Sequence, residues 1–197
     1  MSCKPLEAGI NTNCQKEGKV GGINKRIFVG DVNDIDSGVL DFDADGAVDA
    51  FALTSPGTLK MFVSDRFLQA GRDELVVNEF GPPVWKHAVD FVHMYWDQED
   101  IKTLEQLARA KQLFVIVETN NGQFIVFGLG NTTLCYDNFG LKAEVQTGTT
   151  GVKISDDVTG KTTLSGEVPN KPMLYKPLQA GATTAQELEA MSEAFSS

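Results

Sequence analysis

One stretch near the middle of the chain constrains the fold more than any other. Residues 113–118 read Leu-Phe-Val-Ile-Val-Glu, and residues 123–128 read Gln-Phe-Ile-Val-Phe-Gly. Two short runs rich in β-branched and aromatic residues are typical of strands that are covered on both faces. Between them lies Asn120-Asn121-Gly122, and Asn-Gly favours the positive φ angles of a tight hairpin turn. The sequence therefore predicts a buried β-hairpin on which other strands must assemble.

Further strands are predicted on both sides of this hairpin. Residues 86–96 carry apolar side chains at both alternate sets of positions, which indicates a strand covered on both faces. Other short runs of β-forming residues are bounded by Gly, Pro or polar turns and are also predicted as strands. They are residues 26–32, 48–53, 58–64, 74–80, 141–147 and 159–167. The chain is therefore predicted to be mainly β, as a β-sandwich or a β-barrel.

One packed α-helix is predicted, over about residues 98–111. Asp97 or Asp100 can cap it, because a carboxylate accepts hydrogen bonds from the free amides of the first turn. Apolar side chains recur at helical spacing while charged side chains face the other way. The apolar positions are Ile101, Leu104, Leu107 and Ala108. A single apolar stripe predicts that the helix packs against a sheet.

Both ends of the chain are predicted to lie outside the sandwich. Residues 1–24 contain four glycines among polar residues and are predicted to form an extended N-terminal arm. Residues 25–168 then form the sandwich domain. Residues 169–197 contain three prolines and are predicted to form an extended linker. The linker would end in a short C-terminal helix over residues 184–195, which begins with a capping box.

Composition excludes several classes of protein. Hydrophobic residues make up 42% and charged residues 22% of the 197, which suits a globular domain and not a collagen, a coiled coil or a disordered tail. No apolar run approaches the roughly 18 residues of a membrane span, so no membrane partner is expected. The net charge of −10 argues against a protein that clamps nucleic acid, because phosphate binding requires a basic face.

The charge is unevenly distributed along the chain. Residues 1–30 contain five basic and two acidic residues, whereas residues 31–100 contain four basic and fifteen acidic residues. Two interpretations stay open. The basic arm of one copy could contact the acidic body of another, or the charges could simply form a solvated surface.

The cysteines indicate a reducing compartment. The chain contains Cys3, Cys14 and Cys135, and its N-terminus lacks the apolar core of a signal peptide. An odd number of cysteines in such a chain predicts free thiols, although a bond between Cys3 and Cys14 stays open. The only histidines are His87 and His93, and no Cys-x-x-Cys is present, so zinc is not expected.

One acidic motif has the spacing of a cation-binding loop. Four aspartates and a glycine match positions 1, 3, 5, 6 and 9 of an EF-hand loop. They are Asp41, Asp43, Asp45, Gly46 and Asp49. Position 12 is Ala52, where a bidentate glutamate should stand. Calcium binding and an acidic turn before the strand at 48–53 are therefore the two alternatives, and no other cofactor is predicted.

No constellation of catalytic residues stands out, so the chain is predicted not to be an enzyme. It has neither a Gly-x-Ser-x-Gly elbow nor a phosphate-binding Gly-x-x-x-x-Gly-Lys. The two histidines lie in the strand at 86–96 without a nameable nucleophile as partner. Trp85, Tyr95 and Trp96 gather around the same strand. They would either anchor a partner or pack on a sheet.

The order of these parts resembles that of a known family. Gly21-Gly22-Ile23 leads into the strand Arg26-Ile27-Phe28-Val29, and one mid-chain helix runs directly into the hairpin at 113–128. A loop at Gly148 then precedes the strand at 159–167. This layout resembles the tail-tube-like structural proteins of tailed bacteriophages and prophages of Bacteroides-type bacteria.

The resemblance implies a function in assembly. Six copies would form a ring in which strands of each subunit join a continuous barrel around a lumen, and rings would stack or meet other tail or connector proteins. DNA would pass the lumen without specific binding, and an acidic lumen would repel its phosphates. The protein would be made in the host cytoplasm and belong to the virion. Lys25 and Arg26 are the candidates for contacts between subunits, and the segment 184–195 leaves a connector or terminator open.

Two other functions stay open. The chain could be a calcium-binding β-sandwich adhesin or carbohydrate-binding module, with Trp85, Tyr95 and Trp96 as a platform and residues 41–49 as the cation site. It could also be a hydrolase without a recognisable motif, although no nucleophile and base can be paired from the sequence.

Overall fold

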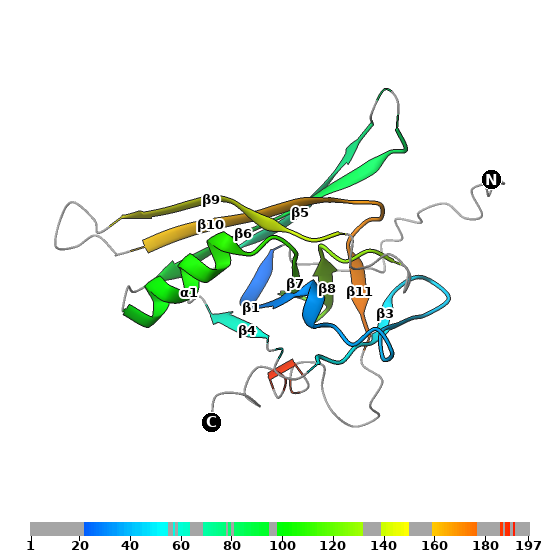
Figure 1. The fold of residues 1–197 in the computed structure, drawn as a ribbon, viewed down its shortest axis with the longest axis horizontal. Helices are drawn as coiled ribbons and strands as arrows, with labels where there is room; N and C mark the ends of the chain where they lie inside the picture. The colour runs from blue at the N-terminus through cyan, green and yellow to red at the C-terminus, as the bar shows by residue number, and fades with distance from the viewer. Residues whose placement is uncertain are drawn as a thin grey trace.

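The hairpin that the sequence predicts lies at the centre of the larger of two β-sheets (Figure 1). The structure is a computed structural model. It describes residues 22–54, 57, 59–63, 69–77, 79, 81–94, 98–131, 139–149, 159–176, 186, 188, 189 and 191. These residues form two sheets and one α-helix, so the predicted mainly β fold class, a sandwich with one packed helix, is confirmed. Most of the predicted N-terminal arm and all three cysteines lie outside the described residues.

The larger sheet has seven strands in the order β2-β3-β11-β8-β7-β1-β4. In chain order they are β1 (Ile23–Asp31), β2 (Asp41–Phe42), β3 (Val48–Ala50), β4 (Lys60–Val63), β7 (Leu113–Thr119), β8 (Phe124–Phe127) and β11 (Met173–Tyr175). A 3-10 turn, η1 (Val32–Asp34), follows β1. In the central hairpin Val115 pairs with Phe127, and Gly122 in the turn has a φ of 74°.

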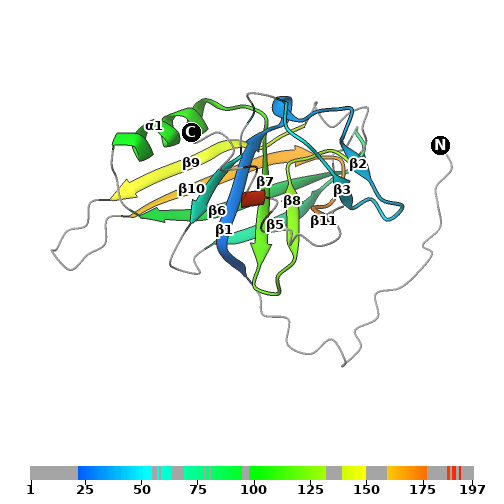
Figure 2. The same ribbon diagram turned by 90° about the horizontal axis from the view of Figure 1, so that it is seen from below.

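The smaller sheet has four antiparallel strands in the order β5-β6-β10-β9. They are β5 (Ala70–Val76), β6 (Val84–Met94), β9 (Lys142–Thr149) and β10 (Thr159–Val168). β6 and β10 pair over ten residues and are the two central strands of this sheet. The strand predicted at 74–80 lies earlier in the chain, because its pairing with β6 ends at Val76 opposite Val84. Figure 2 shows the strands of the two sheets crossing.

The first core lies between the two sheets. Buried side chains of the larger sheet meet those of the smaller sheet and of α1 (Gln98–Arg109). The buried members include Ile27, Val115 and Val117 from the larger sheet, Val89, Phe91 and Leu164 from the smaller, and Leu104 and Leu107 from the helix. The helix is thus formed close to where it was predicted and packs through its apolar stripe. Of the helices described, none is long and apolar enough to cross a membrane.

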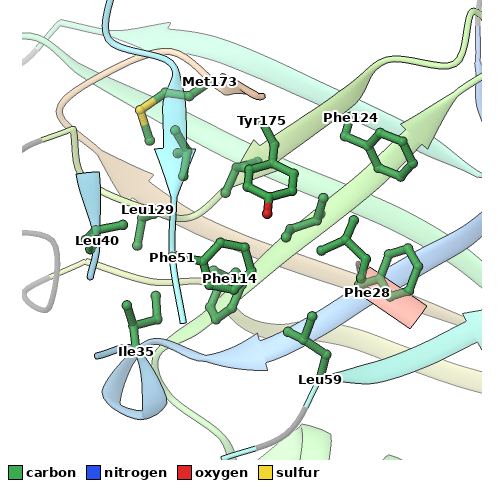
Figure 3. Close-up of a cluster of buried hydrophobic side chains, with 14 of the residues drawn as sticks. Phe28, Ile35, Leu40, Phe51, Leu59, Phe114, Phe124, Leu129, Met173 and Tyr175 are labelled. Atoms are coloured by element: carbon green, nitrogen blue, oxygen red, sulfur yellow. The ribbon is translucent and has the colours of Figure 1, made fainter. Parts of the chain in front are cut away.

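The second core lies on the opposite face of the larger sheet (Figure 3). Phe28 and Phe114 point away from the smaller sheet and pack with Phe51, which comes from the segment after β3. The ring of Phe51 meets Phe114 edge-on at 5.8 Å and Tyr175 at 5.4 Å between centroids. Edge-to-face aromatic pairs of this kind stabilise a core beyond their buried area. The central strands β1 and β7 of the larger sheet are therefore buried on both faces.

The C-terminal part of the chain differs from its prediction. Residues 169–197 were expected to lie outside the sandwich, but β11 forms a strand between β3 and β8. Pro172 stands directly before β11, where its missing N–H removes no hydrogen bond from the strand. Further on, Leu188 lies in a helical segment and its side chain is completely buried in the second core. Pro169 and Pro172 thus lie in the short connection between β10 and β11 and not in an extended linker.

Leu188 provides a test of this C-terminal packing. We expect Leu188→Ala to lower the free energy of unfolding by about 2–5 kcal/mol, because it leaves a cavity in the second core. Leu174→Ala is the matched control, since Leu174 is 40% exposed on β11, and it should cost less than about 1 kcal/mol. Urea unfolding measures both variants. Equal, small effects would show that the C-terminal segment does not belong to the core.

Candidate functional site

The acidic motif at residues 41–49 forms the hairpin between β2 and β3. One carboxylate oxygen of Asp43 accepts hydrogen bonds from the backbone N–H of Asp45 at 3.0 Å and of Ala47 at 2.8 Å. The other accepts one from the ammonium group of Lys176, which follows β11. Gly46 allows the turn with a φ of 81°. Asp43 thus caps a turn and forms an ion pair.

The ammonium group of Lys176 supplies a positive charge to the acidic motif through its ion pair with Asp43. The hydrogen bond from Lys176 is the main reason why the pKa of Asp43 is lowered. The pKa of Lys176 is raised mainly by Asp43, with smaller contributions from the charges of Asp45 and Asp49. Within the described part of the chain, no three His, Cys, Asp or Glu side chains gather where they could hold a metal ion. Calcium binding stays a prediction.

A calcium titration tests this motif. A calcium ion at residues 41–49 would have to displace Lys176 from Asp43, so we expect millimolar calcium to leave the melting temperature unchanged. Magnesium at the same ionic strength is the control for salt effects. A rise in melting temperature with calcium alone would contradict the expectation, because a ligand that binds the folded state stabilises it.

The two basic residues predicted for contacts between subunits lie in β1, an interior strand flanked by β4 and β7. The Nε of Arg26 donates a hydrogen bond to the buried Glu118 at 2.8 Å, and the same guanidinium pairs with Glu189 in the C-terminal helical segment. The ion pairs of Arg26 are therefore within its own chain. The side chain of Lys25 lies outside the described residues, and a role for either residue between subunits stays a prediction.

Of the three aromatic residues singled out in the sequence, only Trp85 lies within the described residues. It stands near the start of β6, half-buried, with the Nζ of Lys171 4.5 Å from its ring centroid. A cation over an indole ring is a favourable contact. Tyr95 and Trp96 are not described, so an aromatic platform stays a prediction.

Buried His87 connects three parts of the fold. Its Nδ1 accepts a hydrogen bond from the backbone N–H of Gly128 at 3.1 Å, and its Nε2 lies 2.7 Å from the carbonyl oxygen of Asn170. These contacts require a neutral ring with its proton on Nε2. Burial lowers the pKa of His87, against smaller opposing effects of Asn170 and of the charge of Asp73. His87 therefore joins β6 to the end of β8 and to the segment before β11.

The histidines make stability depend on pH. The pKa of partly buried His93 is also lowered by burial. A depressed pKa means that the unfolded chain binds more protons below about pH 6.5, so stability falls as the pH falls from about 6.5 towards 5. We expect His87→Gln to weaken this dependence and the double variant with His93→Gln to weaken it further. Urea unfolding between these pH values measures the slope, and an unchanged slope in His87→Gln would contradict a neutral His87.

The smaller sheet has a feature that sequence reasoning missed, which is a pair of open edges. β5 and β9 stand at its two ends, and no further strand covers either of them among the residues that the structure describes. Both carry exposed apolar side chains at or next to the edge, namely Leu75, Val77 and Val145. The C-terminal end of β5 and the N-terminal end of β6 project together beyond the body of the sandwich (Figure 1). An open edge with unpaired backbone groups is a template for pairing with another chain.

The outward face of the smaller sheet carries balanced charges beside a few apolar side chains. Cross-strand pairing places eight charged residues on the face that points away from the larger sheet. The basic ones are Arg72, Lys86, Lys142 and Lys161, and the acidic ones are Glu74, Asp90, Glu144 and Glu167. Lys86 lies 3.6 Å from Glu144, whose pKa is lowered by a hydrogen bond from Ser165 and by Lys86. This face and the two edges form the candidate assembly surface.

Comparison with known proteins gives no relative for this chain: no family model, curated protein or solved structure matches it. The geometry of the candidate assembly surface therefore carries the argument about function.

Proposed function

We propose that the chain is a structural subunit of a phage virion that assembles through its smaller sheet into a ring of the tail-tube type. The observation that carries the proposal is the pair of open edges, β5 and β9, on one four-stranded sheet. Such a sheet can pair edge to edge with the same sheet of neighbouring copies. Closure into a ring then pairs both edges of every copy. The resemblance to tail-tube-like proteins, which implies six copies, is consistent with this mode of assembly.

The directions of the strands favour such a ring. Each pair of neighbours in the order β5-β6-β10-β9 is antiparallel, so β5 and β9 run in opposite directions. Copies around a ring axis are related by rotation, which keeps the direction of each strand along that axis. The β9 of one copy and the β5 of the next would therefore meet antiparallel, and the strand pattern would continue unbroken from copy to copy.

The two faces of the smaller sheet are also suited to this arrangement. The inner face is covered by the larger sheet and α1, whereas the outward face carries charged, Ser and Thr side chains beside a few apolar ones. In a closed barrel of such sheets the outward face would line the lumen. The partners of the chain would be other copies of itself, further tail or connector proteins, and DNA that passes without specific binding. This role involves no catalysis.

Electron microscopy of the purified full-length chain, together with its mass in solution, tests the proposal. We expect rings or short tubes with a central hole. The variant Leu75→Lys/Val77→Lys should give monomers with the native fold, because lysine on an edge strand opposes pairing. Met61→Lys/Val63→Lys is the matched control, since these exposed residues lie on β4, the edge of the larger sheet. It should still form rings.

A wild-type chain that stays monomeric at high concentration would contradict the proposed ring. If rings persist in the β5 variant and disappear in the β4 variant, the contact between subunits lies on the larger sheet.

A further inference from the structure

We propose that Asp90 keeps the outward face of the smaller sheet from holding DNA, because it forms ion pairs with two cations that would otherwise be free to bind phosphate. This inference rests on the proposed ring, since DNA meets this face only where the face lines a channel. It concerns the electrostatic surface of the lumen, and it differs from the acidic lumen expected from the sequence.

Asp90 lies at the centre of the face. It belongs to β6, and it stands in register with Ala70 of β5 on one side and Thr163 of β10 on the other. Asp90 is only 7% exposed, and the hydroxyl of Thr163 donates a hydrogen bond to its Oδ1 at 2.6 Å. A carboxylate held at this depth between two strands keeps a fixed position.

Two cations reach Asp90 from the neighbouring strands. The Nη2 of Arg72 on β5 lies 3.2 Å from its Oδ2, and the Nζ of Lys161 on β10 lies 3.6 Å from the same oxygen. More than half of the Arg72 and Lys161 side chains is exposed, so both are open to solvent while they are paired. Asp90 is the one carboxylate on the described part of this face with two ion pairs among those within 4 Å.

A cluster of the acidic residues of the chain lies away from the smaller sheet. The aspartates at residues 34–49 belong to η1 and to the segments around β2 and β3. The outward face of the smaller sheet has as many basic as acidic residues, so its field is weak in either direction. A surface of this kind neither attracts nor strongly repels a polyanion. Loss of one carboxylate per subunit would make every copy of the face positive.

Asp90→Asn tests the inference with little change in shape. The asparagine side chain has the same size and still accepts the hydrogen bond from Thr163, but Arg72 and Lys161 lose their counter-charge. Asp43→Asn is the matched control. It makes the same change in net charge and leaves Lys176 without its ion pair, but it lies on the hairpin between β2 and β3.

The measurement is the binding of a short fluorescent DNA duplex to the full-length protein at low salt, by anisotropy. We expect wild type and Asp43→Asn to bind weakly and alike, and Asp90→Asn to bind about tenfold more tightly or better, with a gain that disappears at high salt because phosphate contacts release counterions. Mass and microscopy of each variant report the assembly separately.

The outcomes separate this inference from the proposed function. Equal DNA binding by Asp90→Asn and Asp43→Asn, in protein that forms rings, would overturn the role of Asp90 and leave the ring intact. Tighter binding by Asp90→Asn that survives high salt would also overturn it, because the gain would not be electrostatic. A selective, salt-sensitive gain in protein that never forms rings would support neutralisation by Asp90 and reject the proposed ring.

Discussion

The structure depends on one constraint: the hairpin β7–β8 is apolar on both faces and must be covered twice. β7 has buried side chains at six of its seven positions, and the five apolar ones alternate between the two cores. The smaller sheet and α1 cover one face. The segments around β2 and β3, together with β11 and Leu188, cover the other. Burial of apolar area is the main favourable term in folding, so each cover is required.

Covering both faces of the hairpin brings together segments that are distant in the sequence. Polar contacts at the margins of the two cores connect these segments. Arg26 connects β1 to Glu118 on β7 and to Glu189 near the C-terminus. Lys176 connects the end of β11 to Asp43. His87 connects β6 to the backbone at Gly128 and Asn170. Glu118 and His87 are buried, and a buried polar group must find hydrogen-bonding partners, so their contacts help to specify which segments meet.

Local patterns in the sequence predict the elements well and their partners poorly. The hairpin at 113–128 and the helix at 98–111 form as expected, because their periodicity and turn residues are local signals. β11 was missed because three residues after a proline give no periodic signal, and its pairing with β3 and β8 comes from tertiary packing. For the same reason the spacing of the aspartates at 41–49 did not reveal Lys176, which is distant in the chain.

The site is harder to predict than the fold, and Asp90 shows why. In the sequence it is one of several polar residues in the strand, and its role depends on which residues stand beside it on β5 and β10. Cross-strand register brings Arg72 and Lys161 to it. Asp90 itself is buried, but more than half of each cationic side chain is exposed. Ion pairs with such exposed partners typically contribute little to stability, about 0–1 kcal/mol each. The cores already hold the sheet together, so stability does not account for the balanced charges on its free face. We propose that the balanced charges control the potential over that face.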